Sequence, residues 1–243
     1  ICFIFGEKKI TDSNKRKKSI SYGKLKKFEV DRIKLIIISS IILIIFWASF
    51  EQAGGLMNIF AYEKTDRFIN FLNFEVPASW FQSINPLLII LLGFFVSALW
   101  LSFQRKGFLS SSIFKMAVGI MIMGAGFVFM FFAAQDAQIY GKSPMFWLIL
   151  AYLFHTIGEL CASPVILSFI TKLSPKQLVA SIMGIYFAAI GLGNKFAGSI
   201  GQYSEKLGEK AVFIGITVVC VSVGSIVIFF HSKLIRLSHG IDK

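Results

Sequence analysis

Charged side chains are scarce in this chain. Of its 243 residues only 16% are Asp, Glu, Lys or Arg, whereas 56% are hydrophobic, and the mean hydropathy is +0.72. Soluble domains usually carry about 25% charged residues. The low charge content therefore excludes an ordinary soluble domain. Long uncharged stretches are instead typical of helices that cross a membrane.

Cysteine and histidine are also few, and neither type is clustered. Cys2, Cys161 and Cys220 lie far apart, so no metal-ligand or redox spacing exists among them. The three histidines are likewise dispersed, and the sequence contains no nucleophile–base set and no phosphate-binding loop. We therefore expect neither an enzyme nor a bound metal or organic cofactor.

Uncharged blocks predict an all-α integral membrane protein with six transmembrane helices. Three of the blocks contain a single charged residue: Glu51 in the first, Glu159 in the fourth and Lys195 in the fifth. Each is long enough to cross about 30 Å of hydrocarbon at about 1.5 Å per residue. The predicted spans are 35–62, 76–104, 116–135, 143–171, 177–203 and 211–230.

Positive charge gathers before the first span. Of 25 Lys and Arg, 11 precede residue 35. Such charge can bind nucleic acid, but directly before a span it indicates the cytoplasmic side of a membrane. We predict a basic cytoplasmic segment and linker at 1–34, a six-helix bundle at 35–232 and a cytoplasmic tail at 233–243. Inside segments then carry 19 Lys and Arg and outside loops 5, which places both termini in the cytoplasm of a plasma (inner) membrane protein.

Two further patterns concern helix packing. Pro86 and Pro164 lie inside predicted spans, where proline kinks a helix and frees a backbone carbonyl. Small residues recur every four positions along the fifth span, at Ala189, Gly193, Ala197 and Gly201. Small residues at a spacing of four let helices approach closely in lipid.

Glu51 is one of the charged residues that the bilayer should disfavour. An ionisable group at the centre of a membrane helix costs about 2.5–3.5 kcal/mol or more, so it marks a pathway or relay by default. On one continuous helix Trp47, Glu51, Gly54 and Asn58 would share a face that suits a cavity. The alternative is a carboxylate near the outer interface that reaches for water.

Glu159 lies in the middle of its span, with His155 and Ser163 one turn away on either side. A carboxylate in a nonpolar environment can take up a proton or hold an amine, depending on its neighbours. The alternative is neutralisation by a structural Lys of another helix. We interpret His155 as a hydrogen-bonded packing residue rather than a proton relay, and Lys195 as a side chain that extends to the interface.

Gln82 and Asn85 stand one turn apart, directly before Pro86. Amides near a kink can orient a peptide-like substrate, and they can equally hold two helices together. The residues alone leave both interpretations open.

Three segments resemble the proton-dependent oligopeptide transporter family, a branch of the major facilitator superfamily. They are FWASFEQAG at 46–54, ASWFQSINPL at 78–87, and GELCASP at 158–164, which continues to TKLSP at 171–175. Their order and spacing are similar to helices seven, eight and ten of that family. The resemblance covers residues 35 to about 232 and implies the C-terminal six-helix half of the fold.

The resemblance implies roles for several residues. Asn85 and Glu159 would receive the amino terminus of a peptide, with Ser163 nearby and Gln82 also in the binding site. Glu159 would in addition take part in proton coupling.

On the first span, Glu51 would pair with a basic residue of the N-terminal half, as part of a gate or proton relay. Trp47 and Tyr186 would line pockets for peptide side chains. The sequence departs from the family at Tyr186, where many relatives carry Trp, and at Phe50, where some carry a second acid.

The resemblance therefore implies half of a symporter of di- and tripeptides, with protons as the coupling ion and the substrate site at the interface with an N-terminal half. Because the chain begins at Ile1 rather than Met, we expect a fragment or a separate half that does not transport by itself. The alternatives are a facilitator for another solute, such as nitrate or a drug, and a non-transporting scaffold.

Overall fold

The computed structural model describes residues 26–107 and 110–242 of the chain. Within these residues six helical segments are long and apolar enough to cross a membrane, which confirms the predicted spans. The first segment consists of α2, the short 3₁₀ turn η2 and α3, and the others are α4 to α8. Their bounds are α2 Lys27–Phe50, η2 Glu51–Ala53, α3 Leu56–Lys64, α4 Ile84–Arg105, α5 Ser112–Tyr140, α6 Met145–Leu173, α7 Val179–Leu207 and α8 Glu209–Phe229.

The predicted three-part division of the chain remains a prediction. Residues 1–25 of the predicted basic segment lie outside the described residues, while 26–34 lead into and begin α2. At this end Glu29 accepts a hydrogen bond from the backbone N–H of Lys26 at 2.8 Å, and the apolar stretch of the helix follows. The first turn of α2 is thus held by its own acidic residue.

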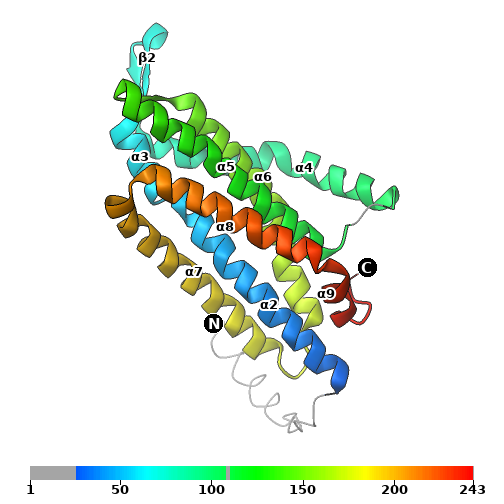
Figure 1. The fold of residues 1–243 in the computed structure, drawn as a ribbon. Coiled ribbons are helices and arrows are strands. Elements are labelled where there is room, and N and C mark those ends of the chain that lie inside the picture. Colours follow the sequence, from blue (N-terminus) through cyan, green and yellow to red (C-terminus); the bar gives the residue numbers. More distant parts are fainter. Residues whose placement is uncertain (1–25, 108–109, 243) are drawn as a thin grey trace, which may run out of the picture.

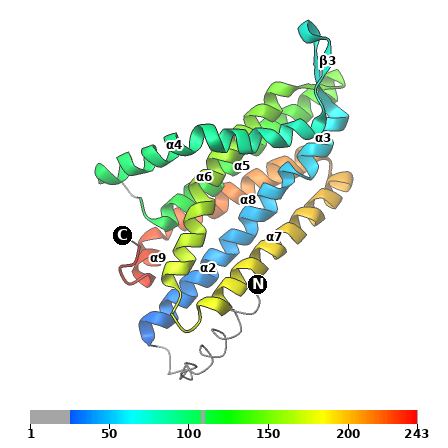
Figure 2. The ribbon, with the colours of Figure 1, turned by 180° about the vertical axis from the view of Figure 1, so that it is seen from behind.

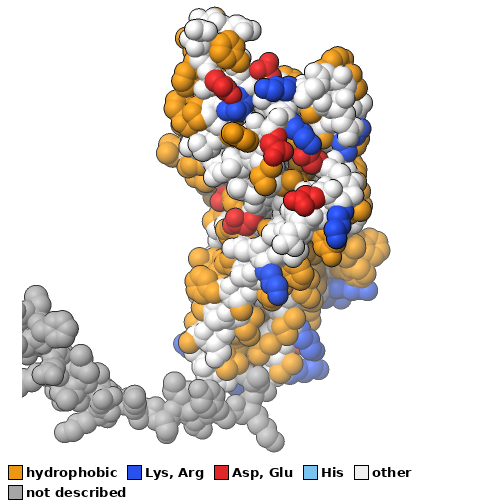
Figure 3. Space-filling model, turned by 90° about the vertical axis from the view of Figure 1, so that its left-hand side faces the viewer, with side chains coloured by type: hydrophobic (Ala, Val, Ile, Leu, Met, Phe, Trp, Pro, Cys, Tyr) orange, Lys and Arg blue, Asp and Glu red, His pale blue; other side chains and the backbone are white. Residues whose placement is uncertain are grey.

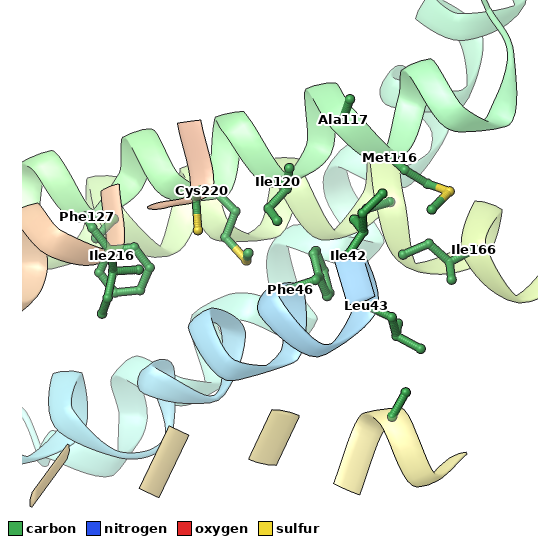
Figure 4. Close-up of a cluster of buried hydrophobic side chains, with 14 of the residues drawn as sticks. Ile42, Leu43, Phe46, Met116, Ala117, Ile120, Phe127, Ile166, Ile216 and Cys220 are labelled. Carbon is green, nitrogen blue, oxygen red and sulfur yellow. The ribbon is translucent and has the colours of Figure 1, made fainter. Parts of the chain in front are cut away.

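The helices form an elongated bundle around α5 (Figures 1 and 2). The α5 helix packs most extensively against α6 and α8, and α2 pairs with α7. Figure 4 shows side chains from several helices in the interior, where Ile42 and Phe46 of α2 lie on the side of that helix that faces α5. Lipid is as apolar as these side chains, so close van der Waals packing rather than water exclusion holds such helices together.

Glycines bring neighbouring helices together at three places. A Cβ atom added at Gly119 of α5 would lie 2.7 Å from the carbonyl oxygen of Gly158 on α6. Gly124 packs in the same way against Cys220 of α8, and Gly193 of α7 against Trp47 of α2. The last contact confirms that the small-residue face predicted on the fifth span allows close approach at Gly193.

The first span is interrupted near its middle. The α2 helix ends at Phe50, η2 makes one tight turn, and α3 begins after Gly55, whose φ of −96° and ψ of −104° lie outside the helical region. Glycine adopts such a backbone conformation at little cost. The prediction of one continuous helical face from Trp47 to Asn58 was therefore wrong, because the helix axis is broken between them.

The α4 helix begins beside α6 and then diverges from the bundle (Figures 1 and 2). It follows the 3₁₀ helix η4 (Ala78–Ser83), and Pro86 occupies its first turn. A proline in the first turn removes no helical hydrogen bond, so the predicted kink inside a span does not occur at Pro86. Pro164, in contrast, does lie inside α6.

No residue of α4 is buried, and large apolar side chains such as Ile90 and Phe94 are 79% and 77% exposed. Its far end still reaches α5, where the Trp100 ring lies edge-on to Phe114 at 6.3 Å between centroids. Most of the apolar surface of α4 is therefore exposed and not covered by the other described helices.

Four short strands connect helices at the opposite end from the start of α2. Strands β2 (Phe68–Ile69) and β3 (Phe74–Glu75) form an antiparallel hairpin that projects beyond the helices (Figure 1). Arg67 and Glu75 form an ion pair at 2.7 Å across it. Strands β1 (Thr65–Asp66) and β4 (Ser143–Pro144) pair in parallel and join the ends of α3 and α6.

After α8 the chain folds back through α9 (His231–Leu237) onto the bundle. His231 Nε2 lies 2.6 Å from Ser111 Oγ, just before α5. The buried carboxylate of Asp242 accepts hydrogen bonds from the backbone N–H groups of Ser112 at 2.9 Å and Ile113 at 3.4 Å. An acidic side chain here satisfies free donors at a helix N-terminus and complements its dipole.

Candidate functional site

The best-defined polar cluster lies where α4 meets α6. The amide nitrogen Nδ2 of Asn85 donates hydrogen bonds to Glu159 Oε2 at 2.9 Å and to Thr156 Oγ1 at 3.1 Å. Thr156 in turn donates to the backbone oxygen of Tyr152 at 2.8 Å, so its oxygen is oriented to accept from Asn85. The cluster both joins the two helices and fixes the position of the carboxylate.

Glu159 is half-buried and forms no ion pair with any described residue. Among the described residues, the alternative of neutralisation by a structural Lys therefore finds no partner. A partly desolvated carboxylate without a cation is an available acceptor for a proton or an ammonium group.

The other predicted members of this site are less closely associated. Ser163 is half-buried one turn beyond Glu159, and Gln82 is exposed in η4. Neither side chain has a hydrogen bond to another described residue. The structure thus brings together Asn85 and Glu159, while Ser163 and Gln82 remain predicted contributors.

Thr156 is a member of the cluster that sequence reasoning missed. It is fully buried and lies three residues before Glu159, so both side chains face α4. The spacing could have identified it. A lone Thr in a membrane helix, however, commonly bonds only to its own backbone, which made the signal weak.

A second polar site lies beside the break in the first span. A cavity of about 580 Å³ opens between this break and α7. Glu51 is half-buried in its wall and has no ion pair with a described residue. The lining residues are Glu51, Gln52, Gly54, Gly55, Leu56, Ile59, Asn194, Ala197, Gly198, Gly201, Gln202 and Glu205.

Three polar residues that line this cavity were not predicted from the sequence. Asn194, Gln202 and Glu205 come from α7, and their spacing places them along one side of that helix. Trp47 and Asn58, which were predicted to share the face of Glu51, do not line the cavity. The carboxylate therefore faces a cavity whose wall is mostly apolar, and α7 rather than the rest of the first span supplies most of its polar side chains.

Gln52 holds the broken span against α7. It is buried, and its Nε2 donates to the backbone oxygens of Ala48 at 3.0 Å and Ala197 at 3.1 Å. Because one side chain bonds to both helices, the position of neighbouring Glu51 relative to α7 is fixed.

The predicted aromatic residues pack within the bundle. Trp47 is half-buried with its ring edge-on to those of Phe46 and Phe50, at 5.8 and 5.5 Å between centroids. Tyr186 is only 7% exposed and belongs to the hydrophobic core. Their predicted contact with substrate remains a prediction.

His155 and Lys195 serve as tests of two further interpretations. His155 is fully buried, with its ring 4.5 Å from that of Phe127, and neither ring nitrogen has a hydrogen-bond partner among the described residues. It is a packing residue, although the expected hydrogen bond was not found. The side chain of Lys195 is exposed on α7 and not buried in the bundle, while its extension to the membrane interface stays a prediction. The described residues also contain no cluster of His, Cys, Asp and Glu suited to a metal.

Charged side chains are unevenly placed on the surface. On the face in Figure 3, acidic side chains gather on the upper part, toward the end that bears the hairpin, and hydrophobic side chains dominate below. Six membrane-length helices, with carboxylates held between some of them, define a multi-pass membrane protein.

Comparison with known proteins identifies its family. A model of the POT family, PTR2, matches residues 6–230. The peptide transporter YePEPT of Yersinia enterocolitica subsp. palearctica is 39% identical over 186 residues, which cover 75% of this chain and 36% of that protein. The chain belongs to the POT family of transporters.

Solved structures agree with this assignment. A peptide transporter POT in complex with sulfate has a TM-score of 0.79 at 26% identity, covering 89% of this chain and 43% of that one. A POT family transporter in complex with a thioalcohol-conjugated peptide has a TM-score of 0.77 at 28% identity, covering 88% and 44%. The chain thus spans less than half the length of the relatives it matches.

Proposed function

We propose that this chain forms the C-terminal half of a proton-coupled symporter of di- and tripeptides. The substrate site would lie between it and an N-terminal six-helix half, and transport would follow alternating access. In this proposal the end at which α2 begins faces the cytoplasm.

The observation that carries the proposal is the geometry at Glu159. Asn85 occupies one carboxylate oxygen, and no described cation neutralises the charge. The group can therefore bind the ammonium terminus of a peptide through a charge-assisted hydrogen bond, which is stronger than a neutral one. The peptide-transport role of the relative YePEPT and the peptide bound to the solved POT transporter support this substrate class.

Proton coupling would involve Glu51 as well. Its carboxylate lies in the wall of a cavity beside a broken helix, and such breaks line pathways in many transporters. A basic residue of the N-terminal half could pair with Glu51, and protonation would release that pair.

The test is uptake of labelled dialanine into liposomes under an inward proton gradient. The chain alone should give no uptake, and the chain supplied with an N-terminal half should accumulate peptide. Glu159→Gln should weaken peptide binding by roughly tenfold to a hundredfold, because hydrogen bonds to charged groups contribute about 1.5–3 kcal/mol. Glu63→Gln, at an exposed carboxylate on α3, is the matched control. Full uptake by Glu159→Gln would contradict the proposal.

A further inference from the structure

A pocket of about 430 Å³ lies at the end of the bundle where α2 begins. Its walls come from the first turns of α2 and from the segment that joins α6 to α7. The lining residues are Glu29, Arg32, Lys172, Ser174, Pro175, Lys176 and Gln177. None of them belongs to the two polar sites described above.

The pocket is positively charged. Three cationic side chains line it, against the single carboxylate of Glu29, and that carboxylate already accepts the backbone N–H of Lys26. The nearest acidic residue along α2, Asp31, is engaged by Lys34 at 3.3 Å and by His239 at 3.1 Å. Among the described residues, no carboxylate forms an ion pair with Arg32, Lys172 or Lys176.

Arg32 is pre-positioned and incompletely satisfied. Its guanidinium lies over the Phe28 ring, 4.9 Å from the centroid, which restricts its rotation. Its Nε is buried and has no hydrogen-bond partner among the described residues. A buried donor without a partner costs about 1–3 kcal/mol, so the described part of the protein does not itself satisfy the guanidinium of Arg32.

The depth of the pocket indicates the source of such an acceptor. Arg32 lies one turn before the uncharged stretch of α2 begins at Leu35, and Lys172 and Lys176 flank the end of α6 at Leu173. These positions fall at the boundary between the hydrocarbon and the headgroup layer. Phosphate groups of lipids occupy that layer, and basic pockets between membrane helices bind anionic headgroups.

We propose that this pocket binds the phosphate headgroup of an anionic phospholipid, with Arg32 as the principal donor and Lys172 and Lys176 as supporting charges. The guanidinium presents several donors in a fixed plane, which matches phosphate oxygens better than the point charge of a lysine. Occupation would tie the start of α2 to the α6–α7 connection through the lipid.

The proposal can be tested by native mass spectrometry of the full chain in detergent. Dioleoylphosphatidylglycerol is the anionic probe, dioleoylphosphatidylcholine the zwitterionic one, and inorganic phosphate the soluble one. The variants are Arg32→Gln, Lys172→Gln and Lys176→Gln. Lys106→Gln removes the same charge from an exposed site beside the end of α4 and is the control. Size-exclusion elution confirms that each variant is folded.

We expect tighter binding of phosphatidylglycerol than of phosphatidylcholine. Each pocket variant should weaken phosphatidylglycerol binding roughly fivefold, the effect of one basic residue near an anionic surface, and Lys106→Gln should leave it unchanged. Equal phosphatidylglycerol binding by the wild type and all pocket variants would overturn the proposal. An Arg32-dependent phosphate adduct without bound lipid would assign the pocket to a soluble anion instead. Absence of any adduct would indicate that another protein segment fills it.

Discussion

Gly119 on α5 and Gly158 on α6 lie directly opposite each other, with no side chain between their backbones. A Cβ at Gly158 would be 2.6 Å from the carbonyl oxygen of Gly119, and the reverse distance is 2.7 Å. This contact sets how closely α5 approaches α6. Thr156 lies two residues before Gly158 and Glu159 directly follows it. The packing of two glycines and the placement of the polar cluster are therefore coupled.

Gly158→Ala should destabilise the bundle. The added methyl group meets backbone atoms that cannot rotate away, and overpacking of this kind costs about 1–3 kcal/mol. The measurement is the thermal unfolding midpoint of the purified protein in detergent. Gly184→Ala is the control, since nothing lies within 4 Å of a Cβ at that position. Equal midpoints for the two variants would show that α5 and α6 can separate freely.

Thr156→Val should weaken the α4–α6 connection without removing the carboxylate. Asn85 would lose one of its two acceptors, and a net hydrogen bond contributes about 0.5–1.5 kcal/mol. We expect a smaller loss of peptide binding than for Glu159→Gln. Thr171→Val, which removes an exposed bond to the backbone oxygen of Leu167 and a contact with Met183 Sδ at 3.9 Å, should bind peptide normally. Unchanged affinity in Thr156→Val would exclude a positioning role.

Glu51→Gln should separate binding from coupling. The amide keeps the size of the side chain but cannot take up or release a proton at ordinary pH. We expect peptide exchange between the two sides of a liposome to persist while proton-driven accumulation is lost. Accumulation at the wild-type level would remove Glu51 from the coupling mechanism. Glu63→Gln again serves as the control.

Asp242→Ala should lower stability through the start of α5. The variant leaves two backbone donors without their acceptor, and loss of a helix cap costs about 0.5–2 kcal/mol. The thermal midpoint should fall measurably. Asp66→Ala removes an acceptor from only one backbone N–H, that of Phe68 in an exposed connection, and should have a smaller effect. The reverse order would mean that the C-terminal contacts contribute little.

Hydropathy alone was sufficient to predict the six spans, because charged and turn-forming residues separate their apolar stretches. The helices themselves extend further, since α2 begins at Lys27 and α5 continues past Asp136 to Tyr140. Hydropathy could not predict the break after Phe50, since the polar pair Glu51 and Gln52 is short and apolar residues resume after it, so the block is also compatible with one continuous helix. It also could not predict the course of α4, because a helix that faces lipid and one that faces protein have similar compositions in a membrane protein.

The polar sites were predictable only in part. Asn85 and Glu159 stand 74 positions apart, and the family resemblance rather than any local pattern suggested that they act together. The wall of the Glu51 cavity depends on the pairing of α2 with α7, which no periodicity in either helix specifies. His155 packs against Phe127 as predicted, but the hydrogen bond that was predicted with it is not found among the described residues.

The cap on α5 also has a consequence for the order of assembly during translation. Asp242 lies 130 positions after Ser112 in the chain, so the ribosome adds it when α6, α7 and α8 have already been synthesised. Until then the backbone N–H groups of Ser112 and Ile113, in the first turn of α5, lack the Asp242 carboxylate as their acceptor. The contact between Asp242 and α5 can therefore form only after the three helices that follow α5 have been synthesised.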